Sequence, residues 1–342
     1  MSETPPLPSK SINPWQIAFV ILGMGLLGAI IWKVDTDAVM AQVMAVGWGI
    51  GFVIAIYLMA FLCDTVSWRL VIRRDQLHKL SFLTLFNIRM IGAAWNKVTP
   101  IFGMAGEPIK AVLLRRYHGV DYKEGAASLV VAKTANLIAL VIFLSGGLGV
   151  ALVSDGLPAA YRVGAMIALL MLTTGIVLLF VVQRFRLSSK SGAWLSRRWF
   201  GKPIVGILDQ MRALDDRLAE AYTQDRRRFV LSVIMTLANW MLGVAELWVI
   251  MWLLGFQITF AEAWAAEAVV ELVRAATFFI PAGIGTQEAA LVLVIGHITG
   301  QPSLGLAVSF IRRARELFYI VWGLPSIGLP IAAAHKWKPE DG

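Results

Sequence analysis

The chain has 342 residues, 58% of them hydrophobic and 15% charged, and its mean hydropathy is +0.70. Such values exclude an ordinary soluble globular domain, so water is not the main solvent of this protein. The formal net charge is +9. Because the Lys and Arg residues lie beside apolar runs, they predict contact with anionic lipid and not with nucleic acid.

Long apolar runs predict an all-α polytopic membrane protein. Residues 1–14 contain several prolines and predict a disordered cytoplasmic tail, and residues 15–330 predict a single transmembrane domain. A helix needs roughly 20 apolar residues to span the hydrocarbon core. Six runs meet or approach that length: 15–32, 43–63, 125–153, 163–182, 229–256 and 304–329. Two further apolar stretches, 81–116 and 263–299, are interrupted by Pro, Gly and charge, so each predicts a broken, re-entrant hairpin.

The positions of Lys and Arg in the loops predict the orientation of the spans. Arg69, Arg73, Arg74 and Lys79 follow the second run, which therefore ends in the cytoplasm. The basic segment 183–228 and the tail 331–342 are expected on the same side, so both termini are cytoplasmic, in a bacterial inner membrane. Apolar residues at helical spacing make 183–228 an amphipathic segment, which lies on the inner leaflet or packs on the protein's own cytoplasmic face.

Two similar motifs predict an internal repeat. Pro100 precedes Glu107 by seven residues with glycines between, and Pro281 precedes Glu288 in the same way, 181 residues later. The same offset aligns repeat A, about 43–153, with repeat B, about 229–329. The charge rule gives the two broken hairpins opposite orientations in the membrane. Such inverted-topology repeats recur in secondary transporters, where the binding site lies at the repeat interface.

Charged residues at membrane depth are costly and are therefore candidates for function. They gather near the two breaks, with Arg89 beside the first and Glu267 and Glu271 beside the second, and on the spans that follow. A helix that restarts at a break would present free N–H groups to a phosphate or carboxylate, and glycines allow close approach. The predicted substrate-binding residues are Lys97, Gly106, Glu107, Lys110, Lys133, Arg274, Gly283, Gly285, Glu288, Arg312, Arg313 and Arg315.

Structural roles for some of these residues stay open. Glu107 and Glu288 could act only as acids that stabilise the N-termini of their helices. Arg315 and Glu316 could form an internal ion pair that holds two helices together. The single cysteine, Cys63, excludes an intrachain disulfide, and the four scattered histidines do not predict a metal site, so no cofactor is expected.

These patterns predict a lipid translocase that moves an anionic or lipid-linked substrate between leaflets through a basic cavity. The expected partners are membrane lipids, with a second copy of the chain or a lipid-synthesis protein also open. No ATP-binding loop is present in the sequence, so we expect the energy to come from an ion gradient, a partner or mass action. The alternatives are a lipid-modifying enzyme with Glu107 and Glu288 as acid and base, and a scaffold or accessory subunit of a hopanoid biosynthesis complex.

Residues 96–116 (NKVTPIFGMAGEPIKAVLLRR) and 278–296 (FFIPAGIGTQEAALVLVIG) resemble the membrane region of the lysylphosphatidylglycerol synthase/flippase family, most of all hopanoid-cluster membrane proteins. The resemblance covers about residues 15–330 and implies a lipid translocase fold. It places the family's Gly-Glu element on Gly106 and Glu107. Where relatives often have an Asp-Arg pair, this chain has Ala132 and Lys133. The soluble aminoacyltransferase domain of bifunctional relatives has no counterpart in this sequence, so lipid synthesis is not implied.

Overall fold

The structure is a computed structural model that describes residues 14–98, 106–153, 225–277 and 283–323, with Ile280 and a few positions between 163 and 177. In this part of the chain, every regular element is helical. The helices of the first half are α1 (Pro14–Lys33), α2 (Thr36–Val46), a 3-10 turn (Gly47–Gly49), α3 (Ile50–Val71), α4 (Arg74–Leu77), α5 (Phe82–Val98), α6 (Gly106–His118) and α7 (Tyr122–Val153). The second half contains α11 (Arg226–Leu253), α12 (Phe260–Ala276), α13 (Thr286–Thr299) and α14 (Pro302–Gly323).

Three helical segments within the described ranges are long and apolar enough to cross a membrane: Thr36–Val71, Tyr122–Val150 and Arg226–Leu253. The prediction of an all-helical membrane protein is therefore confirmed for the part of the chain that the structure describes. The second predicted span, 43–63, lies within the first of these segments. The 3-10 turn separates α2 from α3, and the straight helix runs from Ile50 to Val71. The predicted span 163–182 and nearly all of segment 183–228 lie outside the described residues.

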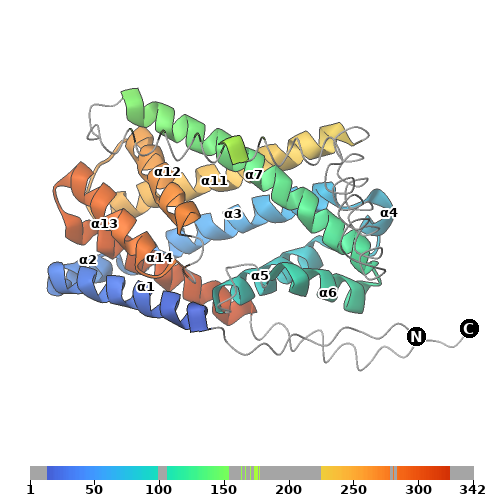
Figure 1. The fold of residues 1–342 in the computed structure, drawn as a ribbon, viewed down its shortest axis with the longest axis horizontal. Coiled ribbons are helices and arrows are strands. Elements are labelled where there is room, and N and C mark those ends of the chain that lie inside the picture. Colours follow the sequence, from blue (N-terminus) through green and yellow to red (C-terminus); the bar gives the residue numbers. More distant parts are fainter. Residues whose placement is uncertain are drawn as a thin grey trace, which may run out of the picture.

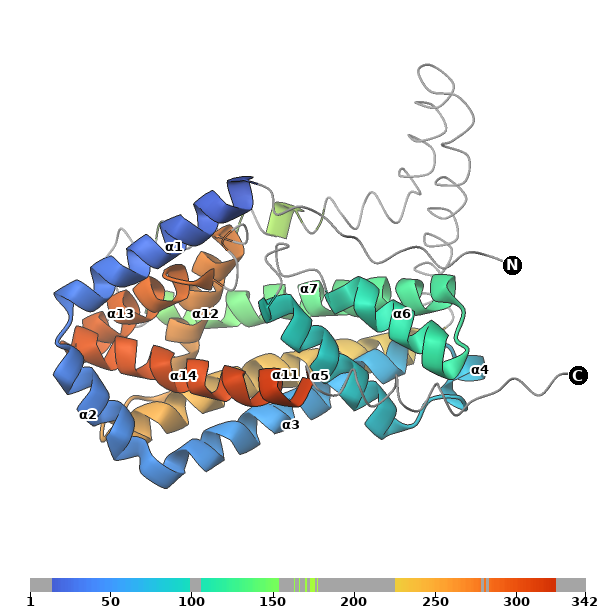
Figure 2. The same cartoon turned by 90° about the horizontal axis from the view of Figure 1, so that it is seen from below.

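Each of the two interrupted stretches forms a pair of helices. α5 ends at Val98 and α6 begins at Gly106, whereas α12 ends at Ala276 and α13 begins at Thr286. Figures 1 and 2 place the α5–α6 pair at one end of the molecule and the α12–α13 pair at the other. Between them α3 and α11 lie side by side along the molecule. The two helix pairs therefore lie toward opposite ends of a shared pair of long helices.

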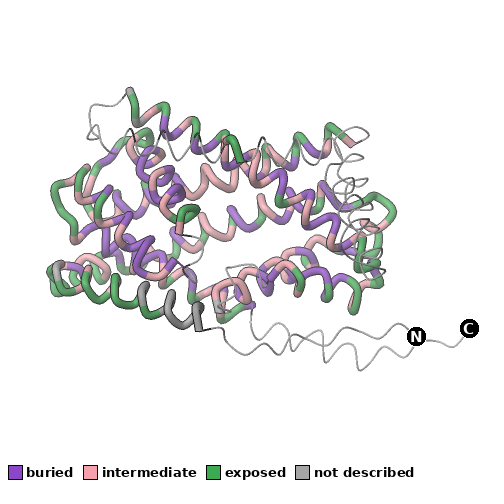
Figure 3. Tube along the Cα trace, viewed as in Figure 1, coloured by how far each residue is buried: buried purple, intermediate pink, exposed green. Residues whose placement is uncertain are grey.

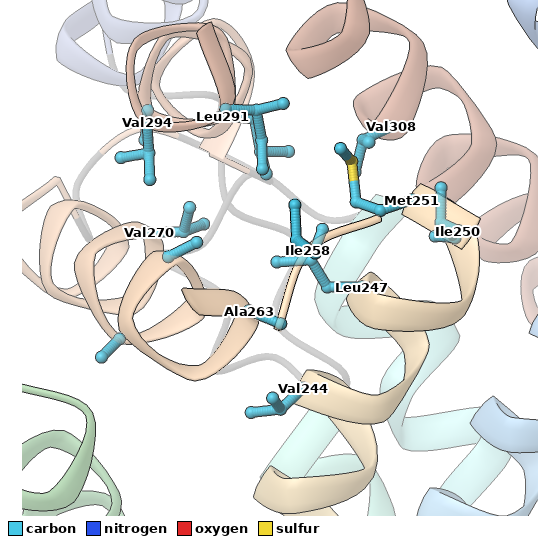
Figure 4. Packing of buried hydrophobic residues seen from close by; sticks show 14 of the residues in the cluster. Val244, Leu247, Ile250, Met251, Ile258, Ala263, Val270, Leu291, Val294 and Val308 are labelled. Carbon is cyan, nitrogen blue, oxygen red and sulfur yellow. The ribbon is translucent and has the colours of Figure 1, made fainter. Parts of the chain in front are cut away.

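A hydrophobic core packs around each pair. One core joins α7, α11, α12, α13 and α14 and includes Leu247, Met251 and Val270 (Figure 4). The other joins α3, α5, α6 and the start of α7 and includes Trp68 and Leu114. Buried residues follow the inner sides of the helices, while the outside carries many exposed residues (Figure 3), large apolar side chains among them. An apolar outer surface is suited to lipid.

Glycine permits the closest helix contact in the first pair. A Cβ atom on Gly106 would lie 2.1 Å from the carbonyl oxygen of Gly92 on α5. The backbone N–H of Gly106 donates a hydrogen bond to Asn96 Oδ1 at 2.7 Å, so a side chain of α5 caps the first turn of α6. Small residues with backbone-to-backbone contact are typical of packed membrane helices.

Candidate functional site

A polar cavity of about 560 Å³ lies between the two helix pairs. Every described helix from α3 onward contributes to its wall, except the short α4. The aromatic part of the wall is Tyr57, Phe61, Trp240 and Tyr319. The volume is within the usual range for small-ligand sites. Polar and charged side chains are costly inside a membrane, so such a wall points to a functional site.

The wall carries seven cations and six carboxylates. The cations are Arg89, Lys97, Lys110, Lys133, Arg274, Arg312 and Arg315, and the carboxylates are Asp64, Glu107, Glu246, Glu267, Glu271 and Glu316. Four of these carboxylates are among the most buried charged side chains of the described residues: Glu246, Glu267, Glu271 and Glu316 are 1–7% exposed. Charged groups so deeply buried are stable only when each is paired.

Among the wall residues each carboxylate has one cation partner, and Glu316 also pairs with Arg313 from outside the wall. The pairs are Arg89–Asp64, Arg315–Glu246, Lys97–Glu316 at 2.5 Å, Lys110–Glu107 at 2.6 Å, Arg312–Glu267 at 2.7 Å and Arg274–Glu271 at 3.0 Å. Two of them join residues one turn apart on the same helix, and the other four cross between helices. The lining is thus a set of six matched ion pairs rather than a uniformly basic surface.

One cation is left over. Within the described residues, Lys133 has no carboxylate within ion-pair distance, although it lies close enough to Glu107 and Lys110 to interact with their charges. Its side chain is exposed, while Thr134 beside it is buried. The formal charge of the wall is therefore positive by a single unit.

Several donors in the wall have unused hydrogen-bonding capacity within the described residues. The Nε atoms of Arg89, Arg312 and Arg315 are buried and have no partner, and neither does Nε1 of Trp240. Arg315 also stacks over the ring of Tyr57, 4.0 Å from its centroid. Guanidinium groups that use one edge for a carboxylate and keep another donor free can still bind an oxygen of a ligand.

Glu288 has a structural position. It is 2% exposed and lies outside the cavity wall. Its carboxylate accepts a hydrogen bond of 2.7 Å from the N–H of Gly285, which closes a capping arrangement at the start of α13, and it pairs with Arg313 at 2.7 Å. Gly285 itself has φ +81°, a conformation that glycine adopts without strain. For Glu288, this geometry fits the structural role, in which the carboxylate stabilises the N-terminus of α13.

Eight of the predicted site residues line the cavity and four do not. Those in the wall are Lys97, Glu107, Lys110, Lys133, Arg274, Gly283, Arg312 and Arg315. Those outside it are Gly106, Gly285, Glu288 and Arg313, which take part in helix packing, capping and pairing. Arg315 and Glu316, considered as a possible pair with each other, have different partners: Arg315 pairs with Glu246, and Glu316 with Lys97 and Arg313.

Sequence reasoning missed two of the carboxylates in the wall. Asp64 and Glu246 are single acids inside the apolar runs of α3 and α11, and that isolation was the signal that could have identified them. Asn96 was also missed, because an amide beside a break is not unusual by itself. Among the described residues, no group of three His, Cys, Asp or Glu is arranged to hold a metal ion.

A model of the family described as the lysylphosphatidylglycerol synthase transmembrane region matches residues 15–323. The chain belongs to this family. The family resemblance read from residues 96–116 and 278–296 is therefore confirmed, and the match spans the whole cavity, from α3 to α14. Membership in the family ties the chain to membranes and to lipid handling.

A curated relative gives a more distant comparison. The chain is 28% identical over 201 residues to a UPF0104 membrane protein of Methanothermobacter thermautotrophicus (strain Delta H). The aligned region is 54% of this chain and 56% of that relative, so the match spans about half the length of each. No solved structure matches the chain.

Proposed function

We propose that this protein is a lipid translocase of a bacterial inner membrane that holds a polar headgroup in the central cavity while the lipid tails stay in the bilayer. The observation that carries the proposal is the charged cavity itself, whose wall includes three helical segments long and apolar enough to cross a membrane. Charges are maintained in such surroundings when they line a path for a polar substrate. Family membership supports a substrate from the lipid class.

An inverted repeat would explain how the cavity opens to either side. At the offset of 181 residues, the start of α6 falls within one residue of the start of α13, and the start of α7 within one residue of the start of α14. α3 and α11 run in opposite directions in Figure 1, and the helix pairs lie at opposite ends. Two units related in this way can expose a shared site alternately to the two faces of a membrane. The cytoplasmic location of both termini, inferred from loop charge, belongs to the same proposal.

The main rival is a lipid-modifying enzyme. An enzyme with Glu107 and Glu288 as acid and base needs both carboxylates in the cavity. Glu288 lies outside the wall, where it pairs with Arg313 and accepts a hydrogen bond at the N-terminus of α13. A scaffold role fits the abundance of ion pairs, yet it gives no reason for the 560 Å³ polar cavity. Transport of an unmodified lipid accounts for both the pairs and the cavity.

Filling the cavity tests the proposal. Gly243 lies in the wall, and a Cβ atom there would meet only Glu267 Oε1, at 3.8 Å, so Gly243→Leu adds bulk to the cavity without a backbone clash. In proteoliposomes with fluorescent lipids, we expect wild-type protein to exchange lipid between leaflets and Gly243→Leu to fall to the rate of protein-free vesicles. The matched control is Gly149→Leu, at an exposed site of α7 with no atom within 4 Å, which should keep wild-type exchange.

Two results would reject the proposal. The first is chemical conversion of the lipid by the purified wild-type protein without leaflet exchange, which would favour the enzyme. The second is full exchange activity in a folded Gly243→Leu variant, because lipid headgroups would then not pass through this cavity.

A further inference from the structure

The cavity wall has one cation more than it has carboxylates, and that cation is Lys133. We infer that Lys133 sets the charge of the headgroup that the protein accepts, by pairing with the phosphate of a headgroup with one net negative charge. The inference rests on the proposed function and goes beyond it, because it assigns selectivity to one residue.

The location of Lys133 fits contact with a headgroup deep in the membrane. It lies 11 residues after Tyr122, the first residue of α7, which is about 16 Å along the helix axis. Lys133 is also 20 residues, about 30 Å, from the last residue of α7, so it lies inside a hydrocarbon core about 30 Å thick when this helix crosses the bilayer. A lysine at that depth with no protein partner among the described residues is expected to face the cavity and to bind an anion there.

The neighbours of Lys133 strengthen the positive potential at that point. Lys110 and Arg89 lie on the same side of the cavity and both interact with Glu107, which Lys133 also reaches electrostatically. Each of those two cations has its own carboxylate, in Glu107 and Asp64. They can add hydrogen bonds to a phosphate, but only Lys133 can neutralise it without leaving a carboxylate unpaired.

The other half of the wall is balanced. Arg274, Arg312 and Arg315 pair with Glu271, Glu267 and Glu246, so a second negative charge on a headgroup would have to displace one of these buried carboxylates. A zwitterionic headgroup could place its phosphate against Lys133, but its own cation would then have no carboxylate partner, because every carboxylate of the described wall is already paired. The wall is therefore matched to one net negative charge, such as that of a phosphodiester with an uncharged polar substituent.

The experiment compares two fluorescent lipids in proteoliposomes: phosphatidylglycerol, with one net negative charge, and phosphatidylcholine, with none. The variants are Lys133→Met and, as the conservative control, Lys133→Arg. We expect wild-type protein to exchange phosphatidylglycerol faster than phosphatidylcholine. Lys133→Met should slow the exchange of phosphatidylglycerol about tenfold or more, the effect of losing one charge-assisted contact, and slow the exchange of phosphatidylcholine much less. Lys133→Arg should retain the preference.

The possible outcomes separate this inference from the proposed function. If wild-type protein exchanges neither lipid, the proposed function fails. If it exchanges lipid but Lys133→Met keeps the wild-type ratio between the two, or slows both equally, the inference fails and the proposed function stands. A parallel arm measures uptake of inorganic phosphate into the vesicles. Uptake by wild-type protein that Lys133→Met abolishes, without lipid exchange, would make free phosphate the ligand and overturn the lipid assignment.

Discussion

Replacing Arg312 with methionine is expected to lower the free energy of unfolding by about 3–5 kcal/mol, the usual cost of leaving a buried charge without its partner. Arg312 is 3% exposed and Glu267 is 6% exposed, and their ion pair of 2.7 Å joins α14 to α12. Removing the guanidinium leaves the Glu267 carboxylate without its ion-pair partner in surroundings where water is scarce. The measurement is thermal unfolding of the purified protein in detergent, followed by circular dichroism.

The double variant Arg312→Met, Glu267→Met should recover most of that loss, because well-packed apolar residues often replace a buried ion pair without cost. A surface pair provides the control. Arg73 and Asp75 are 42% and 51% exposed, so Arg73→Met should change the stability by about 1 kcal/mol or less. If Arg312→Met lowers the stability no more than Arg73→Met does, the Arg312–Glu267 pair is not buried.

Replacing Gly106 with alanine is expected to cost about 3 kcal/mol and to force α5 and α6 apart. The added Cβ would lie 2.1 Å from the carbonyl oxygen and 2.7 Å from the carbonyl carbon of Gly92, and backbone atoms cannot rotate out of the way. Separating the helices would also break the hydrogen bond from Gly106 N–H to Asn96. Thermal unfolding and lipid exchange should both be impaired.

Gly51 provides the comparison for that prediction. It lies in the first turn of α3, and a Cβ atom there would have nothing within 4 Å. Gly51→Ala should therefore be neutral or slightly stabilising, since alanine is the better helix former. Equal melting temperatures for Gly106→Ala and Gly51→Ala would contradict the close contact of α5 with α6.

Helix positions were largely predictable because they depend on local chemistry. The apolar run 125–153 agrees with α7 at Tyr122–Val153, and the run 229–256 with α11 at Arg226–Leu253. Pro and Gly marked the two breaks correctly. The 3-10 turn inside the second span was not predictable, since apolar character continues from α2 through this turn into α3 and does not show where the axis bends.

The pairing of charges could not be predicted in the same way. Lys97 and Glu316 are 219 residues apart, and Arg315 pairs with Glu246 and not with the adjacent Glu316. The composition near the breaks predicts a basic cavity, because bases outnumber acids along the sequence. The sequence does not show which acid each base meets in the folded chain. Only the packing of α5, α11 and α12 against α14 shows that almost every base has its own acid.

The distribution of the six wall pairs bears on how the protein could move. Arg89–Asp64 and Lys110–Glu107 lie within the first half, and three other pairs lie within the second half, where α14 is tied to α11, α12 and α13. Lys97–Glu316 alone, among the pairs of the wall, connects the two halves. A pivot of one half against the other would therefore disrupt one ion pair of the wall, Lys97–Glu316, together with the stacking of Arg315 over Tyr57. The activation energy of alternation would then depend more on Lys97 and Arg315 than on the other cations of the wall.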